Sequence, residues 1–380
     1  FIPELKRINT AVLAIRKSTP VTTGSWQKPA DLFVKEEVLH GKKVNAINIT
    51  LTPTGCEWAK NGGCTMCGEW SGSTLGKKID AKFHIAQFAN AVIDAVPKYR
   101  SPWVRIYQEG SYINSNEVGP SAQKIILSLA SQIKGIKKIT IEGMAKFVTP
   151  EGVKLIKDAV KDNVELEMGI GFEAQDDVIR MVCVNKGELI PQFQRALKIL
   201  KENGLKSLAY VLLKPAFLTE REAIEEAVKT IHKAFELGFD VVSLEPLSIH
   251  EWSLIEALYI NKLYQPPWLW SVVEVAKRCK GVPNLRIGGV EYYPRPNIIA
   301  NNKHADGDGC NGRVWKSIRD FNSSQDLNVF NNVECECKTR WEEEIKRNDI
   351  DLKQRINEYL DQVSIEDFLR YKKTHRDKFY

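Results

Sequence analysis

Apolar runs of strand length alternate with amphipathic stretches of helical length along most of the chain. One helical stretch, residues 219–238, begins with Thr219 three residues before Glu222, the spacing of a capping box, and ends at Gly238. Strands that alternate with helices are typical of a parallel α/β fold. We therefore predict a partial (β/α)6 barrel, similar to a TIM barrel but open. The six predicted strands are 44–51, 103–108, 138–142, 165–172, 207–213 and 241–245.

The pattern changes in the last quarter of the chain. A seventh, short apolar run at 285–290 is followed, from about Tyr292, by sequence rich in Pro, Asn, Gly, Asp and Cys. Charged, helix-prone sequence returns from about Arg340. We predict two parts: a barrel with an amino-terminal lead over residues 1–290, and a small Cys/His-containing module with a charged helical tail over residues 291–380.

The composition is that of an ordinary soluble globular protein, with 43% hydrophobic residues and a net charge of +6. No stretch approaches the roughly 18 continuous apolar residues of a membrane span. The first residues, FIPELKRINT, lack the apolar core of a signal peptide. We expect a cytoplasmic protein with no membrane partner. The positive charge permits a polyanionic partner without requiring one.

Six of the eight cysteines form two groups, Cys56/Cys64/Cys67 and Cys310/Cys335/Cys337. Clustered cysteines in a cytoplasmic chain favour metal binding over disulfides, because that compartment keeps thiols reduced. Cys183 and Cys279 stand alone in regular segments, and we interpret them as packing residues.

The first cysteine group lies in GCEWAKNGGCTMCGEW, directly after the first predicted strand. This places three thiolates at the carboxyl end of a strand, where β/α barrels carry their active sites. Three thiolates without a fourth suit a 4Fe-4S cluster whose fourth iron binds S-adenosylmethionine (SAM), which one electron then cleaves to a 5′-deoxyadenosyl radical. A structural zinc site and three unrelated cysteines are the alternatives that the C-x7-C-x2-C spacing leaves open.

Each predicted strand ends in ionisable or small polar residues, which predicts a polar ring around a cavity. After the second strand, Gly110 permits close backbone approach and Ser111 offers a hydroxyl, so we expect both to bind SAM. Lys214 and Glu173 are equally compatible with an ion pair that braces the barrel. The other acidic residues at strand ends are Glu109, Glu142 and Glu245.

The second cysteine group is accompanied by a histidine. His304 and Cys310 form H-x5-C, and Cys335 and Cys337 form C-x-C, a set that suits structural zinc in a module with little core of its own. A second iron–sulfur cluster and reduced free thiols are the alternatives.

Several motifs resemble the radical SAM subunit of archaeosine synthase, a family related more distantly to the elongator catalytic subunit. The resemblance extends from the cysteine loop to about Phe321. In place of a motif close to ESRPEF the chain has EGMAKF, so only Glu142 is carried over and no role passes to Met144 or Lys146. The motifs are GCEWAKNGGCTMCGEW, YQEGSYIN, IGFEAQDDVIRMVCVNKGE, YVLLKPAFLTE and YQPPWLWSVVEV.

This resemblance implies a tRNA-modifying C–N lyase that uses a 4Fe-4S cluster and SAM. Its substrate would be a 7-deazaguanine base in the tRNA D-loop, to which a partner subunit has attached lysine, and the product would be archaeosine. The implied partners are tRNA, the lysine-transferring subunit and an electron donor. Lys214, Glu173 and Asn185 are candidate catalytic residues, and Glu142, Glu173 and Lys186 are candidates for orienting SAM or the base.

Two other functions remain open. One is a radical SAM enzyme that transfers methyl or acyl groups to RNA or protein; its methylthiolating branch usually carries extra amino-terminal cysteines, and none precedes Cys56. The other is a non-catalytic, zinc-stabilised binding protein. The basic tail is a candidate phosphate contact in the tRNA reading and a solvated helix end otherwise; its basic residues include Lys372, Lys373, Arg376 and Lys378.

Overall fold

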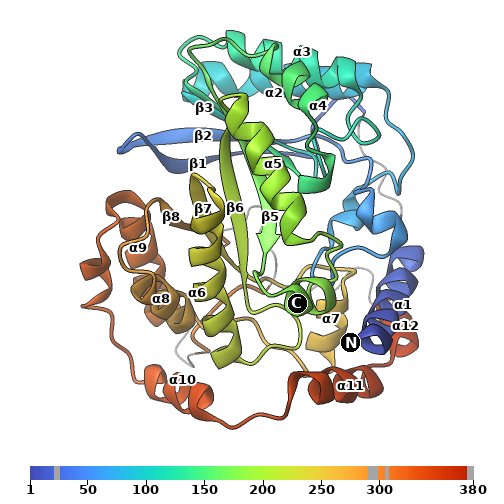
Figure 1. The fold of residues 1–380 in the computed structure, drawn as a ribbon, viewed down its shortest axis with the longest axis vertical. Helices are drawn as coiled ribbons and strands as arrows, with labels where there is room; N and C mark the ends of the chain where they lie inside the picture. The colour runs from blue at the N-terminus through green and yellow to red at the C-terminus, as the bar shows by residue number, and fades with distance from the viewer. Residues whose placement is uncertain (21–25, 290–297, 304–307, 375–380) are drawn as a thin grey trace.

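The computed structural model describes residues 1–20, 26–289, 298–303 and 308–374. Its centre is a curled sheet of eight strands in the order β1 to β8, with helices around it (Figure 1). β1 is antiparallel to β2, and every later neighbour is parallel. The strands are β1 (Asp31–Leu39), β2 (Lys42–Thr50), β3 (Trp103–Tyr107), β4 (Lys138–Gly143), β5 (Glu165–Glu173), β6 (Lys206–Leu213), β7 (Val241–Pro246) and β8 (Leu285–Ile287).

Helices connect the successive parallel strands, so the predicted partial β/α barrel is confirmed. The six predicted strands correspond to β2 through β7, and the short run at 285–290 contributes a further parallel strand, β8. The connecting helices are α2 (Ala81–Tyr99), α3 (Pro120–Gln132), α4 (Pro150–Lys157), α5 (Ile190–Glu202), α6 (Glu220–Leu237), α7 (Leu254–Ile260) and α8 (Leu269–Arg278). The capping box of Thr219 and Glu222 opens α6, as the sequence predicts.

The sequence analysis missed β1. This edge strand carries consecutive charged residues, Lys35, Glu36 and Glu37, and most of its positions are half-buried, so it shows no clear alternation of buried and exposed side chains. His40 and Gly41 form the two-residue connection to β2, both with positive φ (50° and 74°), as in a type I′ hairpin turn.

Glu37 links the two edge strands of the described sheet. Its Oε2 accepts a hydrogen bond from Arg286 of β8 (2.8 Å), and its Oε1 accepts one from Arg105 of β3 (3.0 Å). Burial of the Glu37 carboxyl would raise its pKa, but the two guanidinium groups outweigh this and lower the pKa to about 2. A buried charge bridge therefore joins β1 to β8 where the barrel lacks strand pairing.

The carboxy-terminal helices pack onto the barrel. α12 (Ile365–Thr374) lies beside α1 (Ile2–Ser18), the amino-terminal lead (Figure 1). One hydrophobic cluster includes Ile8, Ile170, Trp341 and Phe368, so the core continues from the barrel into this region. The remaining helices are α9 (Asp308–Ser324), α10 (Cys337–Lys346) and α11 (Leu352–Gln362).

The predicted division into residues 1–290 and 291–380 falls within 290–297, which lie outside the described residues. That division stays a prediction. Within the described ranges, no helix has the length and apolar character needed to cross a membrane.

The carboxy-terminal tail corrects one expectation. Lys372 is only 5% exposed, and its Nζ lies 2.9 Å from Oε1 of Glu256 in α7. A buried ammonium in an ion pair cannot contact a phosphate, so that prediction is wrong for Lys372. Arg376 and Lys378 lie outside the described residues.

Candidate active site at the barrel mouth

The carboxyl ends of the strands surround a cavity of about 970 Å³. This is the end at which β/α barrels bind their substrates. Nine residues that the sequence singled out line the cavity, while Ser111, Asn185 and Lys214 do not. The nine are Cys56, Cys64, Cys67, Glu109, Gly110, Glu142, Glu173, Lys186 and Glu245.

The cysteine loop is held from the amino-terminal side by Arg16 of α1. The Arg16 guanidinium is buried and donates to the backbone carbonyls of Gly62 (3.3 Å), Cys64 (3.2 Å) and Cys67 (2.5 Å). Three carbonyls on one rigid planar cation fix the path of the chain between the second and third cysteines. No sequence motif points to Arg16, because it lies 40 residues before the loop it holds.

The segment after β5 holds the same loop from the other side. The Asn185 side chain donates to the carbonyl of Gly63 (2.7 Å), and the Trp58 indole donates to the carbonyl of Asn185 (2.7 Å). The Thr65 hydroxyl donates to the carbonyl of Cys183 (2.7 Å). Asn185, a candidate catalytic residue, is therefore placed where it positions the cysteines. Its catalytic role stays a prediction.

The three thiols are partly buried, and burial raises the pKa of each of them. For Cys67 the pKa reaches about 11, even though Arg16 acts to lower it. The three sulfur atoms do not all lie within 4.8 Å of one another. Thiolates around one zinc ion are about 3.8 Å apart. In this structure the three sulfurs are therefore not gathered around the position of a single ion.

Glu117 ties the loop after β3 to the cysteine loop. Its Oε2 accepts from the backbone N–H of Ser111 (2.6 Å) and from Gln108 (2.7 Å), while its Oε1 accepts from the backbone N–H of Glu57 (3.0 Å). A Cβ at Gly110 would come within 2.0 Å of this carboxylate, so glycine is required there. The sequence analysis found Gly110 and missed Glu117.

Ser111, the expected SAM contact, is completely buried. Its hydroxyl accepts a hydrogen bond from the backbone N–H of Met144 (3.2 Å). Met144 itself lines the cavity, with its sulfur 4.0 Å from that of Cys56. Ser111 thus lies behind Met144, and its binding to SAM stays a prediction.

Acidic side chains gather on the cavity wall. Burial raises the pKa of Glu142 to about 7, although a hydrogen bond from Tyr210 acts to lower it. Burial also raises the pKa of Glu109, and the neighbouring carboxylate of Glu69 raises it further. Burial raises the pKa of Glu245 as well. With a pKa of about 7, Glu142 can hold a proton near neutral pH, as general acids and bases do.

Glu173 and Lys186 form a buried ion pair on the same wall. Nζ of Lys186 lies 2.9 Å from Oε1 of Glu173 and 3.9 Å from Oε2 of Glu188. A Cβ at Gly171 would come within 2.3 Å of both Glu173 and Lys186, so the pair occupies space that only glycine leaves free. The pair presents one ammonium and one carboxylate to the cavity.

Lys214 takes the bracing role that the sequence analysis considered, but with a different partner. Its Nζ lies 2.6 Å from Oε2 of Glu220, at the start of α6. Both side chains are buried. The structure therefore places Lys214 behind the cavity wall, and its catalytic role stays a prediction.

The second cysteine group also comes together. The donor atoms of Cys310, Cys335 and Cys337 all lie within 4.8 Å of one another, which no other trio of Cys, His, Asp or Glu does in the described ranges. His304 lies outside the described residues.

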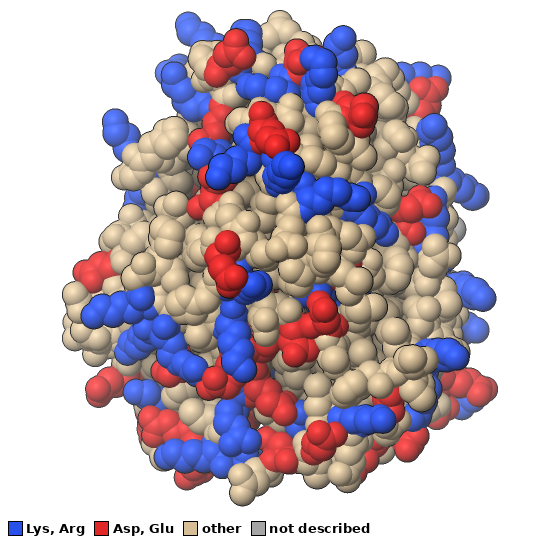
Figure 2. Space-filling view, viewed as in Figure 1, with Lys and Arg blue, Asp and Glu red and all other residues tan. Residues whose placement is uncertain are grey.

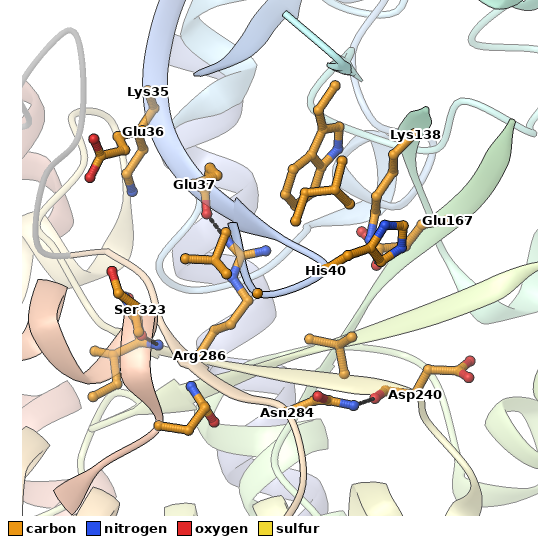
Figure 3. Close-up of a pocket in the computed structure, with 18 of the residues that line it drawn as sticks. Lys35, Glu36, Glu37, His40, Lys138, Glu167, Asp240, Asn284, Arg286 and Ser323 are labelled. Atoms are coloured by element: carbon orange, nitrogen blue, oxygen red, sulfur yellow. Dashed lines mark hydrogen bonds and ion pairs between the residues drawn. The ribbon is translucent and has the colours of Figure 1, made fainter. Parts of the chain in front are cut away.

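A second cavity, of about 600 Å³, lies at the opposite end of the barrel (Figure 3). Its charged side chains are largely neutralised within the wall: Glu37 by Arg286, Lys138 by Glu167 (2.5 Å), and Asp240 by Lys206. In β/α barrels the amino ends of the strands serve stability, whereas chemistry takes place at the carboxyl ends. The cavity with the cysteines is therefore the candidate active site.

On the face shown in Figure 2, basic and acidic side chains are interspersed. This face offers no continuous basic surface of the kind that tracks a nucleic-acid backbone. The charge distribution on this face is therefore no argument for RNA binding.

Comparisons with known proteins give a consistent group of relatives. The chain is 29% identical to archaeosine synthase subunit beta of Methanosarcina acetivorans, over 90% of this chain and 97% of that protein. It is 32% identical to archaeosine synthase subunit beta of Thermococcus kodakarensis, over 82% of this chain and 94% of that protein. No family model matches the chain.

Among solved structures, the chain is similar to an amino-terminally truncated Elp3 of the archaeon Methanocaldococcus infernus. The match has 14% identity and a TM-score of 0.46, and it covers 66% of this chain and 60% of that one.

Proposed function

The chain belongs to the archaeosine synthase subunit beta family, and on that premise we propose that it is a radical SAM enzyme that modifies tRNA. The observation that carries the proposal is the convergence of Cys56, Cys64 and Cys67 on a cavity at the carboxyl ends of the barrel strands.

We propose that these three cysteines hold a 4Fe-4S cluster and that SAM binds beside it. The three cysteines line one cavity, and their sulfurs are not gathered within 4.8 Å of one another as ligands of a single ion would be. The wall next to them offers Gly110, Glu142 and Glu173 as contacts for SAM. When bound, the cluster supplies the electron that cleaves a C–S bond of SAM.

The residues of the chain itself would orient the reactants. Arg16 and Asn185 hold the cysteine loop, and Glu117 fixes the backbone at Gly110. The ion pair of Lys186 and Glu173 offers an ammonium for an anionic group and a carboxylate for a cationic one. Glu142, with a pKa of about 7, can hold or release a proton at the cavity wall.

The finer proposal is a C–N lyase reaction. The substrate would be the lysine-modified 7-deazaguanine base in the tRNA D-loop, produced by a partner subunit, and the product archaeosine. The phrase "subunit beta" in the names of the relatives supports such a partner. An external electron donor completes the set of partners.

The test is mass spectrometry of tRNA nucleosides after anaerobic incubation with SAM, a reductant and lysine-modified tRNA. We expect archaeosine to replace the lysine-modified nucleoside while 5′-deoxyadenosine forms. Cys64→Ala should abolish both products, whereas Cys183→Ala, at a buried site away from the cavity, should abolish neither. SAM cleavage with a different nucleoside mass would refute the lyase and leave a radical SAM enzyme. A reconstituted protein without iron and without 5′-deoxyadenosine would refute the whole proposal.

A further inference from the structure

The sulfur atoms of Cys310, Cys335 and Cys337 lie close together, outside the barrel mouth. Cys310 lies in the first turn of α9, Cys335 in the segment before α10, and Cys337 at the first residue of α10. Their sulfur atoms all lie within 4.8 Å of one another, and those of Cys310 and Cys337 are 3.7 Å apart.

These distances exclude a disulfide between Cys310 and Cys337 and favour a shared zinc ion. A disulfide requires sulfurs about 2.05 Å apart, so Cys310 and Cys337 are not bonded. A tetrahedral zinc ion with Zn–S bonds of about 2.3 Å holds two thiolates about 3.8 Å apart. The separation of 3.7 Å is the edge of such a tetrahedron.

Two neighbouring N–H groups point at the same sulfurs. The Trp270 indole donates to Sγ of Cys337 (3.2 Å), and the Asn302 side chain donates to Sγ of Cys310 (3.3 Å). Neutral thiols are weak acceptors, whereas metal-bound thiolates are stabilised by N–H donors around them. Both donors are buried, so the arrangement is part of the packed structure.

We infer that Cys310, Cys335 and Cys337 bind a zinc ion that fixes α9 and α10 onto the barrel. Three thiolates within 4.8 Å of one another are the ligand type of structural zinc and supply three of its four ligands. This site is separate from Cys56, Cys64 and Cys67, and the inference does not depend on the proposed reaction.

A chain of contacts leads from this site toward the barrel. Trp341 follows Cys337 by one helical turn, and its indole donates to the hydroxyl of Ser271 in α8 (2.8 Å). Ser271 in turn donates to Oε1 of Glu220 (2.5 Å), whose other oxygen pairs with Lys214. The metal would therefore also hold the start of α6, through the position of α10.

The experiment uses the full chain with Cys56, Cys64 and Cys67 replaced by alanine, so that no cluster iron is bound at the barrel mouth. We expect about one zinc ion per chain after purification with zinc, as in other structural sites. Cobalt should replace it and give thiolate-to-cobalt charge-transfer absorption. Cys335→Ser should lose both signals, and Cys279→Ser, at a buried lone cysteine, should keep them.

Cys335 is the best test position because it is the least buried of the three and its replacement disturbs packing least. A strong chelator should lower the unfolding temperature of the parent and leave that of Cys335→Ser unchanged. The inference is overturned if the parent binds neither zinc nor cobalt, if Cys335→Ser binds them equally well, or if the site takes up iron and sulfide instead.

Discussion

Removing the ammonium of Lys186 should destabilise the barrel strongly. Lys186 neutralises Glu173 at 2.9 Å and lies 3.9 Å from Glu188, and the three side chains are 7%, 8% and 0% exposed. Lys186→Met keeps most of the side-chain volume and leaves two buried carboxylates without their cation. Breaking a buried ion pair in this way costs about 3–5 kcal/mol.

The assay is urea unfolding of the metal-free protein, followed by circular dichroism at neutral pH. The double variant Lys186→Met/Glu173→Gln should recover part of the loss, because it removes one of the uncompensated charges. Lys154→Met is the matched control. Lys154 forms an ion pair of similar length with Asp158 (3.0 Å), but the two side chains are 73% and 57% exposed. Such a surface pair contributes less than about 1 kcal/mol.

A loss no larger than that of Lys154→Met would refute the assignment of Lys186 as the cation that neutralises this wall.

Three further predictions concern other parts of the molecule. Cys56→Ala should abolish iron binding at the barrel mouth and 5′-deoxyadenosine formation, measured by iron analysis and chromatography; full iron content would contradict the cluster assignment. Glu37→Gln should lower stability at pH 7 by about 3 kcal/mol, because the pKa of Glu37 falls from 4.5 to about 2 on folding. That difference should be fully present above pH 4.5 and disappear as the pH falls toward 2, which acid titration of both proteins can check. Gly171→Ala should reduce stability by about 1–3 kcal/mol in urea unfolding, because the methyl group would press on Glu173 and Lys186; an unchanged midpoint would show that the pair can move aside.

The sequence predicted the parallel strands well because their signal is local. Strands buried on both faces are continuous apolar runs, and β2 through β7 begin and end within two residues of the predicted bounds. The sequence analysis missed β1 because its formation depends on pairing with β2 rather than on its own composition. Edge strands with several charges carry little pattern of their own.

The candidate site was predictable only in part. The cysteine groups can be recognised in the sequence by their spacing, whereas the residues that hold the cysteine loop come from distant segments. Arg16 lies 40 residues before the cysteine loop that it holds. Asn185, which holds the same loop, lies more than a hundred residues after it. Contacts of this kind depend on how α1 and the loop after β5 pack, and no periodicity in the sequence records them.

The strand ends show why residue type alone does not fix a role. Glu109, Glu173 and Lys214 each follow or end a barrel strand, and each adopts a left-handed backbone conformation, with φ of 61°, 64° and 66°. Side chains other than glycine adopt it at a cost of about 1–3 kcal/mol, and such strain concentrates at functional sites. It also turns the side chain away from the direction that an extended strand would give it. Glu109 and Glu173 nevertheless line the cavity, whereas Lys214 does not line it and pairs with Glu220. The same backbone conformation therefore serves residues that can contact substrate and a residue that braces the wall, and the difference between them comes from the partners that surround each side chain.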